Sequence, residues 1–149
     1  MSDWLNPPES IENYFGFVYK ITKLNPKENE KYYYIGCKQF NKRVKRKPLK
    51  GKTRNRIDHK ESDWKEYWGS SKELLTDIEK YGKESYKREI LHLCSCKWEL
   101  KYLEMKEQMI HNVLLDPLSY NGIVNIRLGS VPKGLVEQKE KYQIHHKDP

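Results

Sequence analysis

Tyrosine side chains near the N-terminus offer the clearest chemistry in this sequence. Tyr19 ends the segment Gly16–Tyr19, and Tyr34 lies within the segment Tyr33–Gly36. A tyrosine hydroxyl in an open site can orient a reacting water or take part in proton transfer. Paired tyrosines on neighbouring strands also pack in ordinary cores, so a structural role stays open for both residues.

Two carboxylates, Glu104 and Glu107, fall in a predicted helix over residues 98–114. At about 100° per residue, Glu107 lies within the apolar seam that should face a sheet, and Glu104 lies on the border of that seam. Burying a carboxylate there is costly unless it binds a metal ion or a cation. Either residue could therefore hold a metal, and a solvated helix surface is the ordinary alternative.

Positive charge is concentrated in residues 38–60. This segment contains eleven Lys and Arg residues and a single acid, Asp58, which gives a local net charge of +10. The whole chain carries +8, so the remaining residues sum to −2. Such a segment suits a phosphate backbone, because its contacts release counterions. Pro48 and Gly51 argue against one long helix, and we expect a basic loop that reaches over a cleft. The expected DNA contacts are Lys38, Lys42, Arg43, Lys45, Arg46, Lys47, Arg54, His59 and Lys65.

Hydrophobic periodicity and capping residues predict the elements that must position these side chains. The strongest helix start is a capping box formed by Ser70 and Glu73, and Gly82 is the natural stop of that helix. The predicted order is β-β-α-α-β-α. The strands are expected over residues 16–23, 31–36 and 86–93, and the helices over residues 64–68, 70–81 and 98–114.

Size and composition indicate one small, heavily solvated domain. The chain has 149 residues, of which 36% are hydrophobic and 34% are charged. No run approaches the ~18 apolar residues of a membrane span, and no signal peptide is visible, so we expect no membrane partner and a cytoplasmic location. Cys37, Cys94 and Cys96 suit reduced thiols, and zinc is disfavoured because a second pair of ligands is missing.

Taken in order, these segments resemble the GIY-YIG endonucleases, and most closely the phage homing-type members. The resemblance covers residues 16–121, and Phe17 and the basic insertion depart from the family pattern. Its landmarks are the two tyrosine segments, Gly69-Ser70-Ser71, Ile90-Leu91, a helix glutamate and Tyr120-Asn121. It implies an α/β (α+β) fold with a small three-stranded antiparallel sheet flanked by helices.

The resemblance also implies the domain limits and the reaction. A nuclease domain over residues 16–124, with its insertion at 38–60, would follow an N-terminal extension over 1–15 and precede a tail over 125–149. The implied activity is hydrolysis of phosphodiester bonds in double-stranded DNA with Mg²⁺ or Mn²⁺. A phage or mobile-element origin is part of the same expectation.

Site residues carry over from the family by position. Tyr19 and Tyr34 would face one catalytic cleft and act on the attacking water, Glu104 would hold the metal, and Asn121 would brace the site. Glu107 remains the rival of Glu104. Arg56 is the expected phosphate clamp, because its spacing from the start of the Ser70 helix matches that of the family arginine, and Arg43 is the alternative.

Two other functions compete with this interpretation. A DNA-binding module without catalysis could use the same basic segment, residues 38–60. The histidines in His145-His146-Lys147-Asp148 resemble the opening half of an HNH nuclease motif, but the asparagine and histidine that complete such a motif do not follow. We interpret these residues as a remnant or as a tail that contacts DNA.

Overall fold

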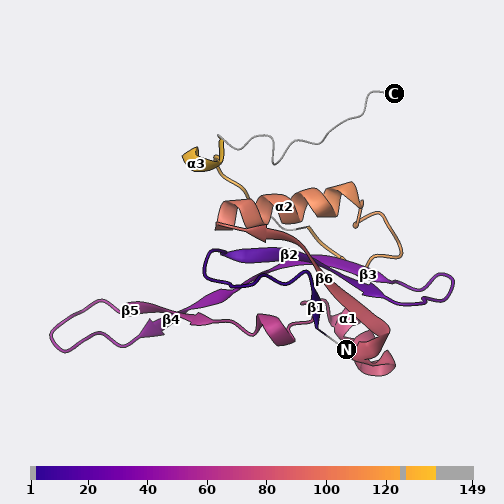
Figure 1. Ribbon diagram of the computed structural model, residues 1–149, viewed down its shortest axis with the longest axis horizontal. Helices are drawn as coiled ribbons and strands as arrows, with labels where there is room; N and C mark the ends of the chain where they lie inside the picture. The colour runs from indigo at the N-terminus through magenta and orange to yellow at the C-terminus, as the bar shows by residue number, and fades with distance from the viewer. Residues whose placement is uncertain (1–2, 125–126, 137–149) are drawn as a thin grey trace.

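A mixed four-stranded sheet forms the centre of the molecule, with the strand order β1-β6-β2-β3. The structure is a computed structural model that describes residues 3–124 and 127–136. Helix α1 lies on one side of the sheet and helix α2 on the other (Figure 1). The elements of this body are β1 (Trp4–Leu5), β2 (Gly16–Lys23), β3 (Tyr33–Gln39), α1 (Lys72–Tyr81), β6 (Tyr86–Cys94) and α2 (Lys97–Ile110), followed by the short α3 (Lys133–Val136).

Strand alternation divides the side chains of β2 between two cores. Phe17, Tyr19 and Ile21 face α1 and pack in a buried aromatic cluster with Leu74 and Ile78 of that helix. Val18 faces the other way and packs with Leu100 and Leu103 of α2. A period of two residues in β2 therefore provides both faces of the sheet with apolar contacts. The three antiparallel strands expected from the sequence are confirmed as β2, β3 and β6.

The fourth strand comes from the expected N-terminal extension. Trp4 and Leu5 pair in parallel with Arg88 and Glu89 of β6. The Trp4 side chain is buried, and its indole Nε1 donates a hydrogen bond to the carbonyl oxygen of Trp64 at 2.8 Å. A two-residue strand is too short to show periodicity in the sequence. Long-range packing of one tryptophan fixes its position instead.

The basic segment is not a loop over a cleft, as we expected, but a two-stranded hairpin. Strands β4 (Asn41–Arg46) and β5 (Arg56–Glu61) pair antiparallel in a sheet of their own. The hairpin extends away from the body of the molecule at the left of Figure 1. We call residues 41–61 the basic ribbon.

Smaller differences concern the ends of helices. Residues 64–66 form only a 3₁₀ turn, η1 (Trp64–Glu66), although Trp64 and Trp68 are both buried. The cap of α1 is Ser71 rather than Ser70, and its side chain accepts a hydrogen bond from the backbone N–H of Leu74. Helix α2 ends at Ile110, and Asn112 follows with a positive φ of 53°.

Most of the expected tail, including His145 and His146, lies outside the described residues. Within residues 3–124 and 127–136, no helix is long and apolar enough to cross a bilayer.

Candidate active site

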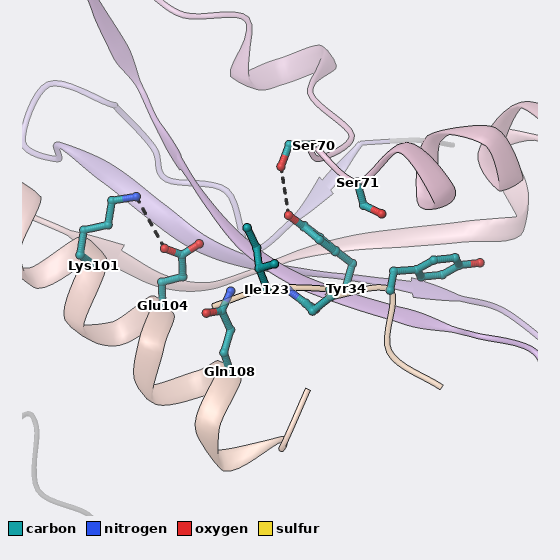
Figure 2. Close-up of a pocket in the computed structure, with 10 residues that line it drawn as sticks. Tyr34, Ser70, Ser71, Lys101, Glu104, Gln108 and Ile123 are labelled. Carbon is teal, nitrogen blue, oxygen red and sulfur yellow. Dashed lines mark hydrogen bonds and ion pairs between the residues drawn. The ribbon is translucent and has the colours of Figure 1, made fainter. Parts of the chain in front are cut away.

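A cavity of about 440 Å³ opens beside strand β3, between the start of α1 and the middle of α2. Figure 2 shows Tyr34 and Ser70 on one side of this cavity and Lys101, Glu104 and Gln108 of α2 on the other. Of the five residues expected to be catalytic, three line it: Tyr34, Glu104 and Asn121. The complete lining is Tyr34, Ser70, Ser71, Lys101, Glu104, Gln108, Tyr120, Asn121, Gly122 and Ile123.

Tyr34 presents its hydroxyl to the cavity from the edge strand of the sheet. The hydroxyl lies 3.1 Å from the Ser70 hydroxyl, which is exposed at the turn before α1. Burial raises the pKa of Tyr34 above its ordinary value, although the hydrogen bond to Ser70 acts in the opposite direction. Tyr34 is therefore a neutral phenol near pH 7, able to donate one hydrogen bond and accept another.

Tyr19 lies behind Tyr34 rather than in the wall of the cavity. The two rings face the same side of the sheet, with centroids 6.1 Å apart, but Tyr19 is only 1% exposed. Burial, followed by the nearby hydroxyls of Tyr34 and Tyr67, raises its pKa well above the ordinary value. Tyr19 thus supports Tyr34 from the core, and its hydroxyl does not reach the solvent-filled space.

Gly36 creates the room that both tyrosine rings occupy. It pairs directly with Tyr19 across the two strands. A Cβ at this position would lie 2.6 Å from the Tyr19 hydroxyl oxygen and 2.9 Å from Cε2 of Tyr34. Only glycine permits this approach, so steric crowding explains why the segment Tyr33–Gly36 ends in glycine.

Gly36→Ala should therefore lower the free energy of unfolding by about 1 to 3 kcal/mol, the usual cost of overpacking a core. Chemical denaturation of the purified protein measures this loss. Gly129→Ala is the matched control, because a Cβ there would meet nothing within 4 Å. Equal stability of the two variants would contradict the steric role of Gly36.

Glu104 and Lys101 project from α2 into the cavity as a charge pair. A Glu104 carboxylate oxygen lies 3.7 Å from the Lys101 ammonium nitrogen, and the same ammonium lies 3.6 Å from the Cys37 sulfur. Burial opposes the charged form of Lys101, but the Cys37 and Glu104 side chains outweigh it and raise the pKa of Lys101 above its ordinary value. Burial, together with Glu104, raises the pKa of the Cys37 thiol to about 12. Near pH 7 the site therefore holds a charged lysine and an unreactive, neutral thiol.

Glu107, the rival carboxylate, lies elsewhere on α2. Its carboxylate is 2.8 Å from Nε2 of His92 and 3.6 Å from Nδ1 of His111. The hydrogen bond from His92 lowers the pKa of Glu107 more than burial raises it. The cost of a carboxylate near the sheet is thus offset by histidines, and Glu107 is not among the residues that line the cavity.

Asn121 and Gln108 fix strand β3 at the bottom of the cavity. The Asn121 side chain accepts a hydrogen bond from the Ile35 N–H at 3.0 Å and donates one to the Ile35 carbonyl at 2.8 Å. The Gln108 amide also donates to that carbonyl, at 3.0 Å. Asn121 therefore holds the backbone of Ile35, the residue between Tyr34 and Gly36.

The side-chain atoms that could hold a metal ion in this cavity are oxygens. Gln108 is buried, and its Oε1 has no hydrogen-bond partner within the described residues. With the Glu104 carboxylate one turn earlier, it gives a sparse set of hard ligands that suits a cation with several bound waters, such as Mg²⁺. In the described part of the chain, no three His, Cys, Asp or Glu side chains gather as a metal site. The donor set thus fits a one-carboxylate magnesium site better than a zinc site.

The structure does not bring Arg56 or Arg43 to this cavity. Arg56 is exposed in β5, opposite Arg46, and its Nε donates to the Lys47 carbonyl at 3.3 Å. Arg43 lines a second cavity at the base of the basic ribbon, together with His59. The spacing of Arg56 from the start of the Ser70 helix did not locate a cavity arginine, because the ribbon lies between the family motifs and extends away from the body of the molecule.

Lys101 is the cation that the sequence analysis missed. A lysine on an amphipathic helix is ordinarily solvated, so it draws no attention by itself. Its position three residues before Glu104 was the available signal, because residues three apart share a face of a helix. Lys38 and Lys65, which were expected to contact DNA, pair with Asp63 and Glu61 respectively.

Comparison with known families agrees with this arrangement of strands and helices. The family described as "Putative endonuclease segE, GIY-YIG domain" matches residues 4–124, and the chain belongs to that family. The domain is thus a GIY-YIG endonuclease domain, a phosphodiester-hydrolysing nuclease whose substrate is DNA. Neither the curated proteins nor the solved structures contain a significant match.

Proposed function

We propose that this protein is a metal-dependent endonuclease that cuts double-stranded DNA in the cavity between α1 and α2. The observation that carries the proposal is the convergence of three groups on one cavity: the Tyr34 hydroxyl, the Glu104 carboxylate, and the Gln108 oxygen, which has no hydrogen-bond partner among the residues that the structure describes. Glu104, assisted by Gln108, would hold Mg²⁺ or Mn²⁺. A divalent ion supplies a positive charge for a phosphate oxygen and for the departing 3′ oxygen.

The tyrosines act at the side of the nucleophile. Tyr34, a neutral phenol hydrogen-bonded with Ser70, orients the attacking water by accepting from it or donating to it. Tyr19 is a positioning residue, because its buried ring holds the Tyr34 ring at the cavity. Asn121 is also a positioning residue, since it fixes the backbone of Ile35 next to Tyr34.

Lys101 stabilises the charge that develops on phosphorus. Its ammonium is charged and half-buried, and it stands beside the carboxylate that holds the metal. A fixed positive group in a partly dry site acts most strongly on the transition state, where the phosphoryl oxygens carry the most charge. We assign this role to Lys101 in place of Arg56, which lies in the basic ribbon.

The basic ribbon supplies affinity for the DNA backbone. The residues expected to contact DNA that lie in it are Lys42, Arg43, Lys45, Arg46, Lys47, Arg54 and His59, all of them exposed. Phosphate contacts by such side chains give binding to any sequence and a strong dependence on salt. The resemblance to phage homing-type members supports a phage or mobile-element origin.

Incubation with supercoiled plasmid, with and without Mg²⁺, tests this function. We expect nicked or linear products only when Mg²⁺ or Mn²⁺ is present, and none in EDTA, because the donor set binds a hard divalent cation. Gel electrophoresis separates the products. Plasmid binding without cleavage in any divalent metal would instead identify a DNA-binding module that lacks catalysis.

A further inference from the structure

Apart from Glu61, which pairs with Lys65 and accepts a hydrogen bond from the Trp64 indole at its base, the basic ribbon is exposed on both faces. Every residue of β4 and β5 is exposed except Val44, which is half-buried. The link to the body lies at its base, where the Ser62 N–H donates to the Phe40 carbonyl and the Ser62 hydroxyl donates to the Gln39 carbonyl. An isolated two-stranded hairpin is at best marginally stable in water. The ribbon therefore has the form of an element that a bound partner stabilises.

Like charges face each other across the ribbon. Lys42 lies directly opposite Lys60, and Arg46 lies directly opposite Arg56. Such pairs destabilise a hairpin by themselves. Asp58, which is 3.6 Å from Arg46, is the single acid between residues 42 and 60. A polyanion that borders the ribbon on both sides would relieve this repulsion more strongly than dissolved salt does, because many of its charges lie alongside both strands at once.

The dimensions of the ribbon select one site on duplex DNA. Six residues per strand make it about 20 Å long, and two strands side by side are about 5 Å apart before side chains are added. The major groove, about 12 Å wide, admits a two-stranded ribbon, whereas the minor groove, about 6 Å wide, is too narrow. In the major groove, rows of phosphates run along both edges of the ribbon.

We infer that the basic ribbon lies in the major groove of duplex DNA and holds the duplex against the cleavage cavity. This inference rests on the proposed function and goes beyond phosphate contact, because it specifies the groove. The alternating side chains of β4 and β5 then have two tasks. Those that reach the groove edges contact phosphates, and those that face inward, toward the base pairs, contact base edges.

A cavity at the base of the ribbon supports this placement. It measures about 490 Å³ and is lined by Arg43, His59 and Lys97 among other residues. Arg43 and His59 are opposite each other in the two strands, and Lys97 begins α2. Glu12, an exposed acid, also lines this space. One backbone of the duplex can pass this cavity as it leaves the ribbon.

Groove-specific blocking tests the inference without requiring cleavage. Fluorescence anisotropy in EDTA would compare binding to an A·T-rich duplex, to the same duplex with bulky C5-substituted deoxyuridine in place of thymidine, and to the unmodified duplex saturated with netropsin. The C5 substituents fill the major groove, and netropsin fills the minor groove. We expect the first change to weaken binding at least tenfold and netropsin to change it less than twofold.

A paired substitution provides the second arm. Lys42→Gln with Lys60→Gln removes a repulsive pair, so thermal stability should stay constant or rise, while the slope of log affinity against log salt should fall by about 1.8, or about 0.9 for each lost phosphate contact. Lys83→Gln with Lys87→Gln makes the same charge change at exposed positions in η2 (Lys83–Ser85) and β6, and should leave the slope unaltered.

Weakening by netropsin alone, or by neither modification, would overturn the inference even if the plasmid is cut. An equal fall in slope for the control pair would also overturn it. If the plasmid is not cut but the C5 substituents block binding, the inference stands for a protein that binds DNA, and the proposed cleavage activity fails. Absence of any DNA binding by the unaltered protein would overturn both.

Discussion

Glu104→Gln is expected to abolish Mg²⁺-dependent cleavage while leaving DNA affinity within a factor of about two to three. The amide keeps the shape of the side chain but removes the negative charge that would hold the cation. Loss of a metal that contributes several kcal/mol to the transition state lowers the turnover rate by about 10³-fold or more. Single-turnover cleavage of plasmid, with affinity measured separately in EDTA, gives the two quantities.

Glu107→Gln is the matched control on the same helix. Its carboxylate pairs with His92 and does not line the cavity, so the turnover rate should stay within a few-fold of the unaltered protein. A collapse of turnover in Glu107→Gln, together with normal turnover in Glu104→Gln, would move the metal site to the other carboxylate. Normal cleavage by both variants would refute a metal site on α2.

Lys101→Met should lower the turnover rate by about 10²- to 10³-fold with little change in affinity, because it removes a charge that acts mainly on the transition state. Methionine keeps the length of the stem and fills the space beside Cys37. Saturating-substrate kinetics separate the rate from the affinity. Lys101→Arg should recover part of the rate, since it restores the positive charge.

Lys106→Met controls for the loss of a lysine from α2, because Lys106 is not among the residues that line the cavity. We expect its turnover to equal that of the unaltered protein. If Lys101→Met affects affinity alone, Lys101 is a simple phosphate contact. The charge that stabilises the transition state would then have to come from another group, and Arg43 and Arg56 would be tested next.

The sheet was the most predictable part of the fold, because its strands bury apolar side chains at a period of two. The sequence predicts β2 at residues 16–23, the range that the structure has. Strands β4 and β5 gave no such signal, since Lys, Arg and His occupy most of their positions and Val44 and Ile57 are isolated. A strand exposed on both faces needs no apolar alternation, so pattern analysis interprets it as a loop.

The positions of the site residues could be predicted where they follow local sequence motifs. They could not be predicted where they depend on long-range packing. Tyr34, Glu104 and Asn121 belong to motifs whose order along the chain reflects their meeting in space. The burial of Tyr19 depends on the aromatic cluster under α1, which no spacing reveals. The distance of Arg56 from the cavity follows from the direction of a hairpin, which residue counting cannot give.

The hydrogen bonds between the Ile35 backbone and the side chains of Asn121 and Gln108 also affect self-association of the molecule. Strand β3 is an edge of the central sheet, and an uncovered edge is a template on which other chains can add strands and aggregate. Asn121 and Gln108 occupy the outward N–H and C=O of Ile35, and the Tyr120 N–H occupies the carbonyl of Tyr33. The segment at Tyr120 and Asn121, which lines the candidate active-site cavity, therefore also protects the sheet edge against self-association. Mutual repulsion of lysine and arginine side chains protects the edges of the ribbon.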